Sequence, residues 1–392
     1  MTDVYIAGAA RTAIGSFGGS LKDVSLIELG TVVAREALKR AGIDGAEVEH
    51  SVFGQVIQTE TRDPYISRVI AIEVGVPHSA GALTVNRLCG SGLQAILSAS
   101  QGIMLGDAQV ALAGGAESMS RAPYILNQAR WGMRLGDSTS TDMLVGSLTD
   151  PFGRIHMGVT AENVAQKFNV ARAEQDALAL ESHRRASHAI DAGYFDDQIA
   201  DVTIRQKGKE VSIRTDEHVR RNAELTDFEK LKPAFREGGS VTAGNASGIN
   251  DGAAALVLAS GKAVERLDLK PMARLVSYAF TGVDPAHMGI GPVSATRLAL
   301  QKSGLTLDDL DVIEANEAFA AQACAVAKEL QFDPRKVNPN GSGIALGHPI
   351  GATGAINTVK LVYEMQRTGA KYGLVTMCIG GGQGIAAIFQ RV

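Results

Sequence analysis

A cysteine in a glycine-rich segment is the first residue of this sequence that could do chemistry. Cys89 stands within residues 86–96, where a predicted strand turns into a predicted helix. A helix N-terminus presents free N–H groups and a partial positive charge, and both favour a thiolate over a thiol. We therefore interpret Cys89 as an activated nucleophile. The alternative is a buried structural cysteine, which is the commoner fate of a lone cysteine.

A histidine lies in a second glycine-rich segment, residues 338–354. Pro349 restricts the backbone of the preceding His348 to extended conformations. An imidazole fixed in this way is suited to proton transfer or to hydrogen bonding with an oxyanion. A histidine that only caps the following helix is the alternative.

Two further segments place polar side chains where predicted strands end. Cys378 closes a buried strand and precedes the glycines at 380–382, whose N–H groups can form a nest for anionic oxygen. Its thiol could move protons, although a phosphate-type glycine loop or a tight crossing of backbones would look the same. Asn316 follows a predicted strand at 311–314 and could hold a water molecule, or it could be a helix N-cap.

Other candidate positions carry weaker signals. The small-residue loop 241–252 could accept a slim ligand arm or be only a tight turn. Arg220 and its neighbouring arginine could meet phosphates, although such pairs are usually solvated surface. The helical stretch with His183 and His188 lacks carboxylates at metal-binding spacing, so we expect no metal there. Cys324, in an alanine-rich helix, is interpreted as a packing residue.

The elements that must position these residues alternate between strand-like and helical patterns, which is typical of α/β folds. Strands are predicted at 4–9, 51–56 and 110–113, and helices at 26–41, before Gly42, and at 93–106. The pattern returns late in the chain. Three pairs of segments match in the same order: 37–43 with 299–305, 85–92 with 337–343, and 112–115 with 378–381. We therefore expect two similar domains packed face to face.

The middle of the chain has a different composition. Residues 120–239 are richer in charge, with one or two amphipathic helices predicted within 162–192 and a polar turn at 206–209. We interpret this part as an inserted lobe, after which 253–258 return to the first unit. The predicted domains are an N-terminal half of 1–119 plus 250–270, a lobe of 120–249, and a C-terminal half of 271–392.

Composition excludes several classes of function. The chain has 392 residues, 45% hydrophobic and 20% charged, with a net charge of −4, so nothing indicates nucleic acid or an anionic membrane as a partner. We expect no apolar run to reach the ~18 residues of a membrane helix. Three sparse cysteines form neither a disulfide framework nor a CxxC metal pair. Without a signal-peptide pattern, the cytoplasm is the expected location.

Taken together, the segments NRLCGSG, NEAF, GHPIGATG and CIGGGQG resemble those of the thiolases in order and spacing. The resemblance covers nearly the whole chain, and it is strongest to the short-chain bacterial type, acetyl-CoA acetyltransferases or β-ketothiolases of polyhydroxyalkanoate synthesis. It implies the thiolase fold, in which two duplicated βαβαβαββ halves pack in layers and carry an inserted lobe. Ser342 departs from the pattern, because many relatives have a second glycine there.

The resemblance also implies a mechanism. Cys89 takes an acetyl group from acetyl-CoA while His348 accepts its proton. Cys378 then removes an α-proton from a second acetyl-CoA, and the carbanion attacks the acetyl-cysteine to give acetoacetyl-CoA. One oxyanion hole would use the N–H groups of Cys89 and Gly380, and another would use His348 with a water held by Asn316. No metal or cofactor is implied, because coenzyme A is a substrate and product.

The family's substrate contacts carry over to further positions. Ala243 and Ser247 would line the pantetheine arm, and Arg220 would lie near the nucleotide end. The tunnel walls would be formed by Leu148, His156, Met157, Phe235, Met288 and Phe319. The two methionines would narrow the acyl pocket and favour short acyl-CoA and 3-ketoacyl-CoA chains, although they could be ordinary core. Relatives are commonly homotetramers, with residues 121–141 as an assembly loop.

Three alternatives remain open at this point. A ketoacyl synthase shares the duplicated fold but uses one cysteine with two histidines or a His–Asn pair, so Cys378 favours a thiolase. A cysteine hydrolase also needs Cys, His and Asn, but the glycine-rich settings and the second cysteine argue against it. A non-catalytic acyl-CoA or lipid carrier would be expected to lose a catalytic residue, and none is missing.

Overall fold

The computed structural model describes residues 2–392 and contains the predicted duplication. The elements of the first half are β1 (Val4–Thr12), α1 (Leu26–Ala41), β3 (His50–Gly54), α2 (Ile66–Glu73), β4 (Gly81–Val85), α3 (Ser91–Leu105), β5 (Val110–Ser118) and β11 (Asn250–Ser260). Those of the second are β12 (Ala273–Gly282), α9 (Gly291–Ser303), β13 (Val312–Ala315), α10 (Ala320–Leu330), α12 (Thr353–Thr368), β14 (Tyr372–Ile379) and β15 (Gln383–Arg391). The first half has the expected βαβαβαββ order, and the second half follows it except at its third strand.

The second half differs from the first at its third strand. In the first half β4 pairs in parallel with β3 along its whole length. In the second half the equivalent pairing is reduced to one parallel bridge between Ile313 and Val337. The chain leaves the sheet there and continues through the short helix α11 (Gly343–Leu346) and the loop of His348 to α12. Within residues 2–392 the second half therefore has no counterpart of β4, and the loop of His348 follows the position where that strand would stand.

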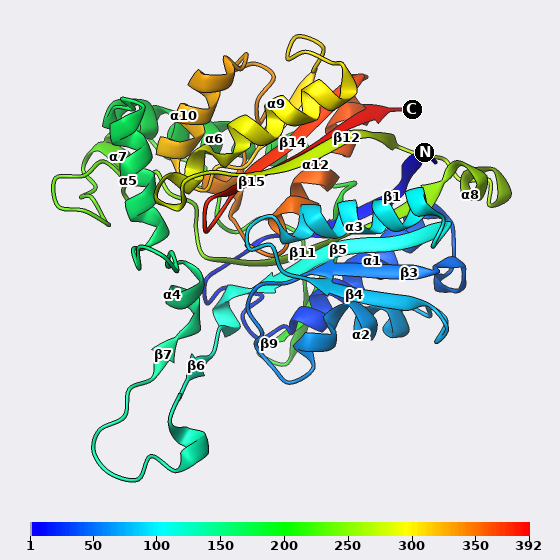
Figure 1. The fold of residues 1–392 in the computed structure, drawn as a ribbon, viewed down its shortest axis with the longest axis horizontal. Coiled ribbons are helices and arrows are strands. Elements are labelled where there is room, and N and C mark those ends of the chain that lie inside the picture. The colour runs from blue at the N-terminus through cyan, green and yellow to red at the C-terminus, as the bar shows by residue number, and fades with distance from the viewer. Residues whose placement is uncertain (1) are drawn as a thin grey trace.

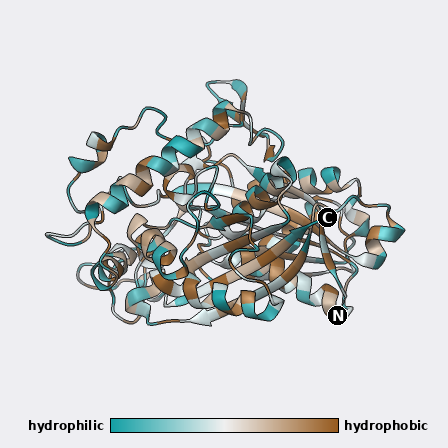
Figure 2. Cartoon of the chain, turned by 90° about the horizontal axis from the view of Figure 1, so that it is seen from above, coloured by the Kyte–Doolittle hydropathy of each residue, from teal (hydrophilic) through white to brown (hydrophobic). Residues whose placement is uncertain are grey.

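The two halves are joined edge to edge and also face each other across a helical layer. The strand order β13-β14-β15-β12-β1-β11-β5-β3-β4 is continuous, because β1 pairs with β12 at Tyr5–Arg274 and Ile6–Ala273. Helices α3 and α12 contact each other, and each also contacts strands of the sheet. Figure 1 shows them between the two groups of strands, with α9 on one outer face. Their buried side chains and those of the strands form one core, and Figure 2 shows hydrophobic residues concentrated along the strands.

The duplicated helices α1 and α9 end in the same way. Gly42 follows α1 with φ 75° and Gly304 follows α9 with φ 71°, both in the left-handed region that glycine adopts without strain. Ser25 begins α1 by accepting a hydrogen bond from the N–H of Glu28 at 3.1 Å. The prediction that Gly42 ends its helix is confirmed.

One expectation about hydrophobicity was wrong. The stretch Leu88–Leu105 is long and apolar enough, by composition alone, to cross a membrane. It coincides with α3, whose residues lie largely inside the protein between the strands and α12. Its apolarity is therefore explained by its place in the core of the layered fold.

The chain between β5 and β11 forms the region predicted as a lobe. It contains β6 (Tyr124–Ile125), β7 (Thr141–Asp142), α4 (Met143–Ser147), α5 (Met157–Lys167), α6 (Arg172–Asp191), β8 (Ile199–Ala200), β9 (Val202–Gln206), β10 (Lys209–Ile213) and α7 (Leu225–Glu229). The 162–192 segment holds parts of two helices, and the polar turn joins β9 to β10 as predicted. The lobe is tied to the first half, since β8 pairs with β1 and Asp216 binds the buried Arg11 at 2.8 Å. The domain boundaries remain a prediction.

Candidate active site

The predicted catalytic residues come together around one cavity of about 370 Å³. Cys89, His348, Cys378 and Gly380 all line it. They come from the turn before α3, the loop before α12 and the end of β14, so both halves of the duplication contribute. The predicted tunnel residues that also line it are Leu148, His156, Met157, Phe235, Ala243, Ser247, Met288 and Phe319. Asn316 and Arg220 are the two predicted residues that do not line it.

Cys89 stands in a turn whose backbone is held under strain. The preceding Leu88 has φ 45°, which a branched side chain rarely adopts. Its N–H donates to Asn86 Oδ1 at 2.9 Å, and its carbonyl accepts from Ser91 Oγ at 2.7 Å. Gly90 cannot carry a side chain, because a Cβ there would lie 2.6 Å from a methyl carbon of Ile379. The turn therefore presents Cys89 at the start of α3 and against the end of β14.

The helix end was predicted to favour the thiolate of Cys89, and burial works against this effect. Burial raises the pKa of the Cys89 thiol to about 11, and the N–H groups of Gly380 and of Cys89 itself only partly oppose this. Burial also raises the pKa of Cys378, whose side chain is fully buried, and the nearby Cys89 raises it further. Both cysteines are therefore thiols at neutral pH, and each must lose its proton during a reaction step. Cys89 needs a base beside it.

His348 lines the same cavity as Cys89 and is the predicted base. It does not cap a helix, since the N-cap of α12 is Ala352. The His348 ring is buried, its Nδ1 lies 2.7 Å from Thr353 Oγ1, and that hydroxyl donates to Pro349 O at 2.9 Å. The hydroxyl must then accept from Nδ1–H, which leaves the lone pair on Nε2. Burial lowers the pKa of His348 to about 4, so the ring is neutral at physiological pH.

Asn316 contacts His348 from outside the cavity wall. Its Nδ2 lies 3.5 Å from His348 Nε2, at the limit of a hydrogen bond. It is not an N-cap, because α10 begins after Phe319. Its Oδ1 is buried without a hydrogen-bond partner in the structure of residues 2–392. Buried polar atoms are rarely left unpaired, so this amide is suited to binding an ordered water.

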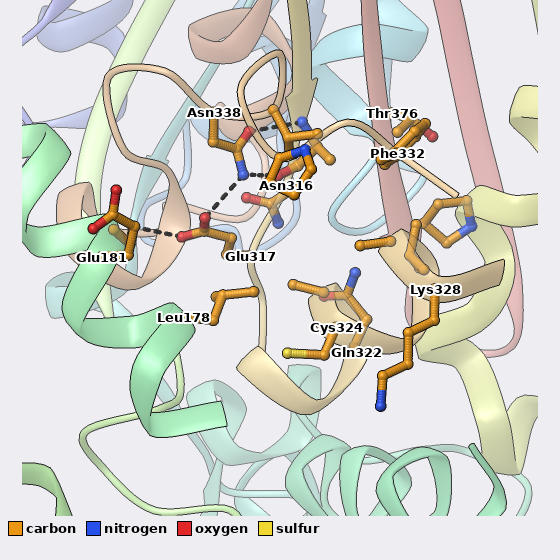
Figure 3. A pocket seen from close by; sticks show the side chains of 18 of the residues that line it. Leu178, Glu181, Asn316, Glu317, Gln322, Cys324, Lys328, Phe332, Asn338 and Thr376 are labelled. Atoms are coloured by element: carbon orange, nitrogen blue, oxygen red, sulfur yellow. Dashed lines mark hydrogen bonds between the residues drawn. The ribbon is translucent and has the colours of Figure 1, made fainter. Parts of the chain in front are cut away.

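A second cavity, of about 340 Å³, lies on the other side of Asn316 between α6 and α10. Figure 3 shows the hydrogen bonds that fix the end of β13 there. Asn338 Nδ2 donates to Ala315 O at 2.8 Å and to Glu317 Oε1 at 2.9 Å, and Asn338 Oδ1 accepts from Ala315 N–H at 2.9 Å. Ser182 Oγ donates to Glu317 Oε2 at 2.6 Å. This network holds the backbone that carries Asn316.

Sequence reasoning missed these supporting residues, although one signal was available. Asn338 is the repeat equivalent of Asn86, and each asparagine side chain bonds the backbone next to a site residue. Thr353 and Asn250 were also missed. Asn250 Oδ1 accepts from the N–H of His348 at 2.9 Å.

Aromatic rings form one wall of the cavity. His156 stacks on Phe235 with ring centroids 4.8 Å apart, and Phe235 meets Phe319 edge to face at 6.1 Å. Gly158 makes room for this stack, since a Cβ there would lie 2.3 Å from the Phe235 ring. Met157 and Met288 line the same cavity and are nearly buried.

Arg220 lies apart from this cavity. It is exposed and lines a separate surface hollow with Asp227 and Leu231. That hollow borders the small-residue loop, because a Cβ on Gly244 would lie 2.6 Å from Leu231. The place of Arg220 near a nucleotide stays a prediction. In the described part of the chain, no group of three His, Cys, Asp or Glu side chains is arranged to hold a metal ion.

Comparison with known proteins gives a consistent result along the whole chain. The family model described as "Thiolase, N-terminal domain" matches residues 4–262, and "Thiolase, C-terminal domain" matches residues 269–391. The chain is 63% identical to the beta-ketothiolase BktB of Cupriavidus necator, covering 100% of this chain and 99% of that protein. It is 49% identical to the acetyl-CoA acetyltransferase of Syntrophomonas wolfei, with 100% and 99% covered. The crystal structure of human mitochondrial 3-ketoacyl-CoA thiolase superposes with a TM-score of 0.98 at 44% identity, covering 100% and 99% of the two chains.

Proposed function

The chain belongs to the thiolase family, and we propose that it catalyses the reversible condensation of two acetyl-CoA molecules to acetoacetyl-CoA and coenzyme A. It is an acyltransferase, and the reverse reaction is the CoA-dependent cleavage of a 3-ketoacyl-CoA. The observation that carries the residue assignments is that Cys89, Cys378 and His348 share one cavity. A ketoacyl synthase would need no second cysteine there.

Acylation uses the pair Cys89 and His348. The thiol proton of Cys89 passes to the Nε2 lone pair that Thr353 leaves free, and the sulfur attacks the thioester carbonyl. The oxyanion is stabilised by the N–H groups of Cys89 and Gly380, the latter already directed at the Cys89 sulfur. When the intermediate collapses, the departing CoA thiolate takes a proton from Cys378, which becomes the thiolate, and His348 keeps its proton on Nε2.

Condensation uses Cys378. A second acetyl-CoA enters, and the Cys378 thiolate removes its α-proton, while the Nε2–H of the protonated His348 and a water on Asn316 stabilise the enolate oxygen. The carbanion attacks the acetyl carbon on Cys89 and forms the new carbon–carbon bond. The Cys89 thiolate then leaves and takes back its proton from His348, while Cys378 keeps the α-proton as its own thiol proton. Each group ends in its starting protonation state, so this cycle requires no metal or redox cofactor.

The cavity fits a slim acyl-CoA. Ala243 and Ser247 lie along its wall and suit the pantetheine arm, with Arg220 farther out at the surface. Met157 and Met288 restrict the acyl end, which favours short chains. The thiols must stay reduced for this chemistry, which supports the cytoplasm as its location.

Assembly into a homotetramer is supported by an exposed apolar arm. Residues 121–141 contain β6 and lead into β7, and Figure 1 shows this segment projecting from the body of the protein. Trp131 is 80% exposed and Leu135 100% exposed. A monomer rarely leaves such side chains in water, so we assign the arm to contacts with other copies of the chain.

The test is CoA-dependent cleavage of acetoacetyl-CoA, 3-ketovaleryl-CoA and a long-chain 3-ketoacyl-CoA, followed by loss of thioester. We expect rapid cleavage of the two short substrates and slow cleavage of the long one. Cleavage of none of them would contradict the proposal and favour a carrier or a synthase. Preferential cleavage of the long one would contradict only the role of the two methionines.

A further inference from the structure

A buried carboxylate that the proposed mechanism does not use connects the loop of His348 to the opposite half of the protein. Glu117 lies near the end of β5 and is fully buried. Its Oε2 accepts hydrogen bonds from the N–H groups of Gly351 at 2.9 Å and Val56 at 3.0 Å. Its Oε1 accepts from the N–H of Ile57 at 3.1 Å. One side chain thus joins β5, the segment after β3 and the loop three residues after His348.

The fit around this carboxylate is tight. A Cβ on Gly351 would lie 2.5 Å from Glu117 Oε2 and 3.1 Å from Gln55 Cα. A Cβ on Gly115, two residues before Glu117, would lie 2.4 Å from Gly351 O. Glycines on both surfaces therefore let the two backbones approach closely, and Glu117 closes the contact by hydrogen bonds.

The charge of Glu117 depends on these backbone donors. All the hydrogen bonds that the structure gives its carboxylate come from main-chain N–H groups. Burial raises the pKa of Glu117 to about 8, against the lowering effect of those N–H groups. Because its two oxygens accept all three hydrogen bonds, the geometry favours the ionised form. The carboxylate and the loop therefore stabilise each other, because neither has another partner for these hydrogen bonds.

We propose that Glu117 is a positioning residue that sets the place of the His348 imidazole relative to Cys89. The inference rests on the proposed function, in which His348 is the base for Cys89. The peptide N–H of His348 is held by Asn250 and its ring by Thr353, and both bonds act near the ring itself. Glu117 instead holds Gly351, three residues after His348, next to Val56 and Ile57. Cys89 packs against the hydrophobic cluster that contains Ile57.

Glu117→Gln is the first test. An amide has the same shape, but in either orientation it sets an NH₂ group against at least one of the three N–H donors. We expect kcat for acetoacetyl-CoA cleavage to fall about 10- to 100-fold, because small misplacements of a catalytic group cost this much. KM values should stay within about twofold, since the CoA contacts lie elsewhere. Asp63→Asn is the matched control: Asp63 is equally buried and accepts from the N–H groups of Thr59 and Glu60, but not from the loop of His348.

Gly351→Ala disrupts the same contact between Glu117 and the loop of His348, because the added Cβ would collide with the carboxylate. It replaces Glu117→Gln as the test if that variant does not fold. We expect a similar fall in kcat, and the double variant should be no slower than about twice either single one. A folded Glu117→Gln enzyme with kcat within twofold of wild type would overturn the inference. A KM that rises in step with the loss of kcat would overturn it too. An inactive wild-type protein would instead contradict the proposed function.

Discussion

Removing the hydroxyl of Thr353 should slow the enzyme without unfolding it. The Nδ1–H of His348 donates to Thr353 Oγ1 at 2.7 Å, and this bond selects the tautomer with a free Nε2. In Thr353→Val the buried Nδ1–H has no partner, and the competing tautomer places its proton on Nε2. The carbonyl of Pro349 keeps its bonds from the N–H groups of Ala352 and Thr353, so no second group is left unpaired.

The size of the effect follows from that single unpaired group. Leaving a buried donor without a partner costs about 1–3 kcal/mol. If this energy falls on the reactive tautomer, and each ~1.4 kcal/mol is a factor of ten, kcat drops about 5- to 150-fold. The acylation half-reaction should slow by the same factor. It is measured as the first release of CoA when the enzyme is mixed with acetyl-CoA, before any condensation.

A matched control lies one turn farther along α12. Thr358 is buried and its hydroxyl donates to Gly354 O at 2.8 Å, the same bond to the carbonyl four residues earlier that Thr353 makes to Pro349. Thr358→Val should therefore change stability about as much as Thr353→Val but leave kcat within twofold. Equal activity of the two variants would refute the tautomer argument. A parallel loss in both would show that the helix, and not the imidazole, was affected.

Three further predictions concern the cysteines, acid stability and the acyl pocket. Cys89→Ser should abolish the acyl-enzyme seen by mass spectrometry, whereas Cys378→Ala should still acylate but lose condensation; equal loss of both half-reactions would remove the separate role of Cys378. Burial lowers the pKa of His183 to about 3, and the charges of His218 and Arg220 lower it further. Below pH ~6.5 the unfolded state therefore binds a proton that the folded state does not, and the free energy of unfolding falls by up to ~1.4 kcal/mol per pH unit. His183→Gln should show a shallower fall in denaturant titrations between pH 6 and 4, and identical slopes would contradict this. Met288→Ala should raise kcat/KM for longer 3-ketoacyl-CoA relative to acetoacetyl-CoA at a cost of about 2–5 kcal/mol in stability, and an unchanged ratio would show that Met288 is only core.

The duplication could be predicted because it leaves local signals. Helices α1 and α9 both need a left-handed residue after their last turn, and glycine at 42 and 304 satisfies it at equivalent places. The reduced third strand of the second half could not be predicted, because Val337 retains a strand-like side chain. The pairing with β13 stops after Val337 because the chain then turns away from the sheet toward α11.

The reactive side chains were predictable for a related reason. Each lies beside glycines, which are needed where two backbones approach closely, and these glycines can be recognised in the sequence. The groups that hold them were not. Glu117, Asn250 and Thr353 bond to backbone or ring atoms that are distant or unremarkable in sequence. The rise in the pKa of Cys89 was not predicted, because the helix end is visible from sequence and the desolvation of the pocket is not.

The pairing of β1 with β11 has a consequence for how the protein is made. Val4 pairs with Ser260, so the first strand to leave the ribosome has its neighbour in the sheet more than half the chain later. Until then both edges of β1, which is almost entirely buried in the finished fold, are open except where its last two residues pair with β8, because its other neighbour β12 comes later still. Its closure by a contact so distant in sequence is slow and exposes the nascent chain to aggregation. Synthesis of this enzyme therefore includes a long stage in which an apolar strand waits for its sheet neighbours.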